Sequence, residues 1–204
     1  MIKTIIFDFG DIFINLDKPA IEKELLKLGV PDITLDMYHQ AAEYEKGHIS
    51  TDILTNYFTN KFPAISARNF KKAWNSIILD FPEYRLKFIE ELTSKQSYKS
   101  ILLSNTNELH IEQVIENMSL ERYNRFKKCF DKFYLSHEIN LSKPNKNIYE
   151  FVLNEDNLIA EECLFIDDTR ENTDAAKELG IHAWNLTPGE DDIINLFEVK
   201  KELF

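Results

Sequence analysis

Two patterns of apolar residues alternate along this chain. Short uninterrupted apolar runs predict strands that are buried on both faces, and apolar positions three or four apart predict helices. Strands that alternate with helices of this length favour right-handed crossovers and a doubly wound parallel sheet. We therefore expect an α/β, Rossmann-like core with strands at 5–7, 98–104, 133–135, 163–166 and 182–185.

One long segment departs from this alternation. Residues 17–81 contain no run typical of a strand and show helical spacing throughout. The segment predicts an inserted helical bundle between a first core part, residues 1–16, and a second, residues 82–204. We expect insertion helices at 19–29, 32–45, from Ser50 or Thr51 onward and at 66–78, and core helices at 82–94, 109–117, 122–131, 147–154, 172–179 and 191–203.

Polar groups stand where four of the predicted strands end. Because the carboxyl ends of parallel strands lie along one edge of a sheet, groups far apart in sequence can meet there. Each group also has a simpler explanation, as a helix cap or a solvated turn. Their joint occurrence favours a site, built from Asp8, Ser104–Thr106, Ser142–Pro144 and Asp167–Asp168.

The residue types in these groups suit phosphoryl transfer. An aspartate such as Asp8 can attack phosphorus and form an aspartyl-phosphate, which divides one difficult displacement into two easier ones. Two anions approach each other only with a cation between them, and carboxylates such as Asp167 and Asp168 are typical ligands of Mg²⁺. Ser104 and Asn105 can donate hydrogen bonds to phosphoryl oxygens. The ammonium group of Lys143 can neutralise the developing charge.

Composition and charge narrow the range of partners. The 204 residues are 44% hydrophobic, which is enough for a folded domain with an insertion. The net charge is −11 and is spread along the chain, which disfavours nucleic acid and anionic membranes as partners. The sequence shows neither a signal peptide nor an apolar run of about 20 residues, so a cytoplasmic location is expected. Cys129 and Cys163 are expected to be reduced packing residues.

The four strand-end groups resemble the signatures of the haloacid dehalogenase-like hydrolase superfamily, and the inserted helices resemble its helical cap. Residues 44–50, 103–107 and 134–136 resemble the branch that contains bacterial glucose-1-phosphate phosphatases. The resemblance implies a Mg²⁺-dependent phosphatase for a small phosphorylated metabolite, with sugar phosphates among the candidates. The implied metal ligands are Asp8, the Gly10 carbonyl, Asp167 and Asp168.

The sequence departs from the superfamily at one position. Phosphatases of this superfamily usually carry an acid/base aspartate two residues after the nucleophile, where this chain has Gly10. Asp11 is one residue later and could contact the substrate phosphate or replace the missing acid, or it could face away. Two alternatives therefore stay open: a non-catalytic phosphate- or partner-binding protein, and a metal-independent dehalogenase-like hydrolase. The paired Asp167 and Asp168 favour a cation over the second alternative.

The insertion also offers candidate substrate contacts. Tyr44, Glu45 and His48 are expected in a loop between two insertion helices, from which they could reach a substrate. Trp74 lies at helical spacing and is expected in the core of the insertion.

Overall fold

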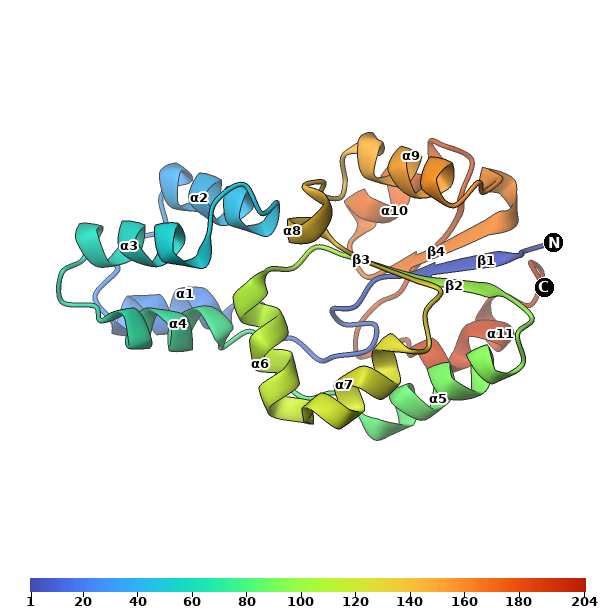
Figure 1. Ribbon diagram of the computed structural model, residues 1–204, viewed down its shortest axis with the longest axis horizontal. Coiled ribbons are helices and arrows are strands. Elements are labelled where there is room, and N and C mark those ends of the chain that lie inside the picture. Colours follow the sequence, from blue (N-terminus) through green and yellow to red (C-terminus); the bar gives the residue numbers. More distant parts are fainter.

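The computed structural model describes all residues, 1–204, and contains a single sheet of five parallel strands. The strand order is β3-β2-β1-β4-β5, with β1 in the centre (Figure 1). Phe7 of β1 is paired with Leu102 of β2 on one side and with Ile166 of β4 on the other. The predicted α/β fold is confirmed, with strands β1 (Thr4–Phe7), β2 (Lys99–Ser104), β3 (Lys132–Leu135), β4 (Cys163–Asp167) and β5 (His182–Asn185).

Helices cover both faces of this sheet. Helices α9 and α10 pack on one face, and α5, α7 and α11 lie on the other (Figure 1). The second face carries the larger apolar cluster, in which Phe126 of α7 stacks on Phe9. The core helices are α5 (Glu83–Ser94), α6 (Glu108–Met118), α7 (Leu120–Lys127), α8 (Ser136–Ile139), α9 (Lys146–Glu155), α10 (Arg170–Lys177) and α11 (Leu196–Val199).

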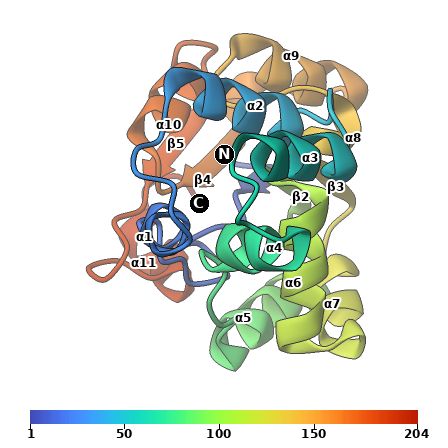
Figure 2. The same ribbon diagram turned by 90° about the vertical axis from the view of Figure 1, so that its left-hand side faces the viewer.

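Four helices lie together beyond one end of the sheet, and Figure 2 views them face on. They bury an apolar cluster of their own, which includes Phe58 and Phe70 with ring centroids 4.6 Å apart. The side chains of Thr34, Ser50 and Ser66 cap the second, third and fourth of these helices. The four are α1 (Ala20–Lys27), α2 (Leu35–Glu45), α3 (Thr51–Lys61) and α4 (Ala67–Asn75).

Some predicted elements differ from the structure. The expected terminal helix over 191–203 is wrong: a 3-10 turn at Ile193–Asn195 precedes α11, which ends at Val199. The Asp192 carboxylate accepts a hydrogen bond from the amide of Ile194, which starts that turn separately. Helix α7 is shorter than predicted because Asp131 already pairs with the backbone of the neighbouring strand β2.

The structure also contains two short elements, two free cysteines and no long apolar helix. Helix α8 and the 3-10 turn at Ala160–Glu162 were not predicted, since both are too short to show a periodicity. Cys129 and Cys163 are buried and free, as expected. None of the helices has both the length and the apolar character needed to cross a membrane.

Candidate active site

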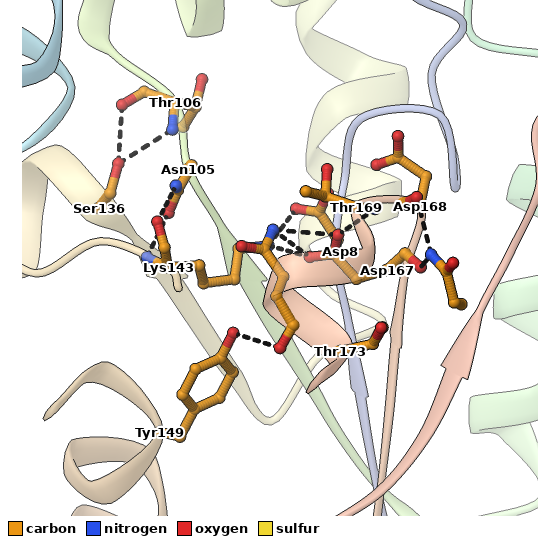
Figure 3. A network of polar contacts seen from close by, with 12 residues as sticks. Asp8, Asn105, Thr106, Ser136, Lys143, Tyr149, Asp167, Asp168, Thr169 and Thr173 are labelled. Atoms are coloured by element: carbon orange, nitrogen blue, oxygen red, sulfur yellow. Dashed lines mark hydrogen bonds and ion pairs between the residues drawn. The ribbon is translucent and has the colours of Figure 1, made fainter. Parts of the chain in front are cut away.

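A buried lysine joins the ends of two neighbouring strands (Figure 3). The Lys143 Nζ atom lies 2.8 Å from Asp8 Oδ1 and 2.6 Å from Asp167 Oδ2, and its side chain is only 1% exposed. Asp8 directly follows β1, and Asp167 is the last residue of the adjacent strand β4. Asp168 completes a group of three carboxylates whose oxygens lie within 4.8 Å of one another. The predicted convergence of the first and fourth strand ends is therefore present in the structure.

Asp167 is the most fully bonded of the three carboxylates. Besides Lys143, it accepts hydrogen bonds from the Thr169 amide at 2.8 Å and from the Asn172 side chain at 3.1 Å. Its side chain is wholly inaccessible to solvent. Asn172 was not predicted as part of the site, and its only sequence signal is its place in the first turn of the helix after β4. These bonds fix Asp167, and through it Lys143.

Burial and charge set the protonation of the central pair. Burial raises the pKa of Asp8 to about 7; the Lys143 ammonium opposes this shift and the Asp167 carboxylate adds to it. For Lys143, burial lowers the pKa, but the carboxylates of Asp167 and Asp8 outweigh that effect and hold the pKa above its ordinary value. Lys143 therefore stays charged beside Asp8 and favours its carboxylate form.

A second lysine, which was not predicted, contacts the outer side of this cluster. Lys18 donates a hydrogen bond to Asp168 and lies 3.2 Å from Asp11 Oδ2. The other Asp11 oxygen accepts a hydrogen bond from the Leu16 amide at 3.0 Å. Asp11 has a φ of 55°, and its carboxylate is occupied by this loop and by Lys18. In this arrangement, Asp11 supports the loop after β1 rather than taking the position of the missing acid.

The second strand end contributes in two different ways. The Asn105 side chain donates to the Lys143 carbonyl at 2.9 Å and accepts from the Lys143 amide at 3.0 Å (Figure 3). This amide therefore holds the lysine loop instead of facing the site. The Ser104 side chain lines a cavity of about 100 Å³, and no protein group bonds its hydroxyl. Of these two predicted phosphate contacts, Ser104 has the free side-chain donor.

Gly10 lines the same small cavity. A Cβ atom at this position would lie 2.7 Å from Leu16 Cδ1, so the glycine lets the Leu16 side chain pack against the loop. Leu16 thus occupies space next to the position where related phosphatases are expected to carry an acid.

A larger cavity of about 370 Å³ lies among the helices α1, α2 and α4. Most of its lining is apolar, and Trp74 both lines it and belongs to the buried cluster of these helices, as predicted. Glu45, Ile77 and His110 line both the larger and the smaller cavity. The two cavities therefore adjoin at these residues.

The three expected substrate contacts of the insertion separate in the structure. The Tyr44 hydroxyl lies 2.7 Å from Thr51 Oγ1 and accepts from the Leu109 amide. The exposed ring of His48 bonds Glu43 at 2.9 Å. Tyr44 and Glu45 form the end of α2 rather than a loop, and of the three only Glu45 reaches both cavities.

The donor set of the carboxylate cluster suits a hard divalent cation. Three carboxylates supply oxygen ligands within a small radius, and Mg²⁺ prefers such oxygens. Asp8 and Asp168 are better placed than Asp167, because their side chains keep 11% and 7% of their surface accessible, whereas that of Asp167 keeps none.

Comparison with known proteins identifies the family. Residues 5–185 match the haloacid dehalogenase-like hydrolase family. The chain is 30% identical to a D-ribitol-5-phosphate phosphatase of Bacteroides thetaiotaomicron, over 94% of this chain and 95% of that protein. The chain therefore belongs to the haloacid dehalogenase-like hydrolases.

Solved structures give the same result. An enzyme of this family from Bacteroides thetaiotaomicron, solved with magnesium and inorganic phosphate, aligns with a TM-score of 0.80 at 30% identity, over 94% of this chain and 97% of that one. A protein from Porphyromonas gingivalis that is described as a predicted hydrolase of this family aligns with a TM-score of 0.82 at 25% identity, over 98% of both chains.

Proposed function

We propose that this protein is a Mg²⁺-dependent phosphatase that hydrolyses a small phosphorylated metabolite through a phosphoryl group carried on Asp8. The observation that carries this proposal is that Asp8 contacts the Lys143 ammonium at 2.8 Å and has a carboxylate oxygen within 4.8 Å of one of Asp168. The similarity to a D-ribitol-5-phosphate phosphatase supports a sugar or polyol phosphate as the substrate class. The magnesium and phosphate in a solved relative support the metal and the phosphoryl chemistry.

Five residues of the chain have separate roles in the proposed reaction. Asp8 attacks phosphorus, and the bond to the leaving oxygen breaks. Lys143 offsets the negative charge that collects beside Asp8, and the Ser104 hydroxyl donates to a phosphoryl oxygen. Asp167 positions Lys143, and Asn105 holds the backbone of the lysine loop. Water then attacks the phosphorylated Asp8 and releases phosphate.

The metal would be held by Asp8, Asp168 and the Gly10 carbonyl, with Asp167 behind them. When bound, Mg²⁺ supplies positive charge that lets two anions approach and screens the phosphoryl oxygens. The helices of residues 17–81 would act as a cap that excludes water from the site, with residues 1–16 and 82–204 as the catalytic core. A cytoplasmic location, and the absence of nucleic acid and membrane partners, stay predictions from the sequence.

The test measures phosphate release from D-ribitol 5-phosphate, other sugar and polyol phosphates and an aryl phosphate. Asp8→Asn should abolish release from every ester while the protein stays folded, because an amide cannot act as the nucleophile. Asp174→Asn, on the exposed part of α10, is the matched control and should keep full activity. Chelation with EDTA should silence the enzyme, and added Mg²⁺ should restore it.

Three results would contradict this proposal. Full activity of Asp8→Asn would remove the mechanism, and activity that ignores EDTA would favour the metal-independent dehalogenase-like chemistry. Thermal stabilisation by phosphorylated ligands without any phosphate release would identify a non-catalytic binding protein.

A further inference from the structure

The expected acid/base group is absent from the core of this site. Departure of an alkoxide needs a proton, and a positioned acid typically contributes about 10²- to 10⁴-fold in rate. Gly10 has no side chain to supply it, and Asp11 is occupied by Leu16 and Lys18. A proton donor for the leaving oxygen therefore has to come from another element that borders the cavities.

Most titratable side chains that line the cavities are unsuitable. His110 has both ring nitrogens occupied, one by Asn107 at 3.1 Å and one by the Trp74 carbonyl at 3.2 Å. Glu22 lies on the exposed side of α1 and accepts a hydrogen bond from Tyr38. Lys18 is paired with Asp168 and Asp11. The remaining acid is Glu45.

Glu45 has the geometry that a proton donor needs. It ends helix α2 and lines the small cavity together with Gly10 and Ser104, the proposed phosphate contact. No side-chain hydrogen bond or ion pair engages its carboxyl group, and Glu45 lines both the larger and the smaller cavity. The carboxyl is thus free to meet the leaving oxygen of a substrate.

The end of α2 is also fixed against the core, so that Glu45 does not depend on a loose loop. The Ser136 hydroxyl lies 2.6 Å from the Glu45 carbonyl and accepts a hydrogen bond from the amide of Thr106, two residues after the end of β2 (Figure 3). The side chain of Asn140, the residue directly after α8, donates to the Lys46 carbonyl at 2.8 Å. Gly47 packs so closely on α8 that a Cβ there would lie 2.0 Å from the His137 carbonyl oxygen.

We propose that Glu45, supplied by the helical insertion, is the general acid and base of this enzyme in place of the side chain that Gly10 lacks. This inference rests on the proposed function. As Asp8 attacks, the bond between phosphorus and the ester oxygen breaks, and the Glu45 proton passes to that oxygen to give the free alcohol. The Glu45 carboxylate then takes a proton from the water that attacks phosphorylated Asp8, which releases phosphate and regenerates both carboxyl groups.

The surroundings of Glu45 agree with this role. Burial raises the pKa of Glu45 to about 7, and the neighbouring Lys46 charge only partly opposes the shift. A carboxyl group that titrates near neutral pH can both give and accept a proton during one turnover. The other titratable groups around the cavities are Lys18, Glu22, Tyr38 and His110.

The experiment compares kcat/KM of Glu45→Gln on two substrates with Mg²⁺ present. An alkyl phosphate, such as a polyol phosphate, needs its leaving oxygen protonated, whereas p-nitrophenyl phosphate leaves as a stable phenolate. Because kcat/KM reports the steps up to departure of the leaving group, it is insensitive to later hydrolysis of the intermediate. We expect a loss of about 10²-fold or more for the alkyl ester and less than about 10-fold for the aryl ester.

Glu43→Gln is the matched control, since Glu43 lies on the same helix but bonds the surface residues His48 and Lys46. It should leave both substrates unchanged. Equal losses of Glu45→Gln on both esters, or no loss on the alkyl ester, would overturn the inference and leave the proposed function intact. A wild-type protein that releases phosphate from neither ester would instead overturn the proposed function, and this inference with it.

Discussion

The sheet edge and the helical insertion differ in polarity: the first buries paired charges, and the second encloses a mostly apolar cavity. At the sheet edge, charged side chains are buried, and each is satisfied: Lys143 contacts both Asp8 and Asp167, and Asp167 accepts further bonds from Asn172. The insertion instead encloses a mostly apolar cavity of about 370 Å³ with few polar groups. The first region holds the charged groups that the proposed chemistry needs in satisfied contacts, and the second leaves space that the proposed substrate would fill. Glu45 lies in the insertion by sequence, and it lines both the cavity of the insertion and the small cavity at the sheet edge.

The largest effect should come from removing the ammonium group of Lys143 at the centre of the sheet-edge site. Lys143→Ala leaves the buried carboxylates of Asp8 and Asp167 without their cation, which should lower the free energy of unfolding by about 3–5 kcal/mol and abolish phosphate release. Urea unfolding at pH 7 without metal measures the first quantity. Lys18→Ala is the control for stability, because that lysine is 54% exposed and should contribute about 1 kcal/mol or less. Similar losses of unfolding free energy for both variants would show that the buried contacts of Lys143 stabilise the fold no more than the exposed contacts of Lys18.

A pH experiment tests the protonation of His110, which lines both cavities where the two regions meet. Burial lowers the pKa of His110 from 6.5 to about 4, so the native state binds fewer protons than the unfolded state between these values. The stability that neutral His110 contributes is present above pH 6.5 and is lost as the pH falls toward 4, by up to about 3 kcal/mol.

The comparison of wild type with His110→Gln isolates this contribution. Burial shifts the pKa of Asp8 and Glu45 upward, and these groups favour the native state as the pH falls; both are present in the two proteins. Unfolding free energies at pH 7 and pH 4.5 should therefore fall more steeply for wild type. Parallel profiles would mean that folding does not lower the pKa of His110.

The smallest of the expected effects concerns the cavity alone. Ala41 lines the larger cavity, and Ala41→Leu should fill part of it. We expect KM for a polyol phosphate to rise about 10-fold, since a misplaced methylene group in such a pocket changes binding by about 1–3 kcal/mol. Competitive inhibition by inorganic phosphate should stay unchanged, because that anion needs only the sheet edge. If inhibition by phosphate weakened equally, the two regions would not be separable.

The strands, most of the helices and the polar residues at the strand ends could be predicted from the sequence, because they follow from local patterns. Short apolar segments and their alternation with helical spacing predicted all five strands, and the Asp8 and Asp167 carboxylates lie at the ends of two of them. The terminal helix was overpredicted, since the segment forms a 3-10 turn, which the Asp192 side chain caps, followed by the short helix α11. Apolar spacing alone does not contain that information.

The sequence by itself determined the sheet, the insertion and the type of chemistry at the strand ends, because strand and helix periodicities are properties of neighbouring residues. Only the tertiary structure decided which side chains face one another. It turned Asn105 toward the Lys143 backbone and Asp11 toward Lys18, and it placed Glu45 on the same small cavity as Gly10. Contacts between residues far apart in sequence depend on how the helices pack on the sheet and on one another. That packing reflects the shape of the whole core, which no single segment of the chain encodes.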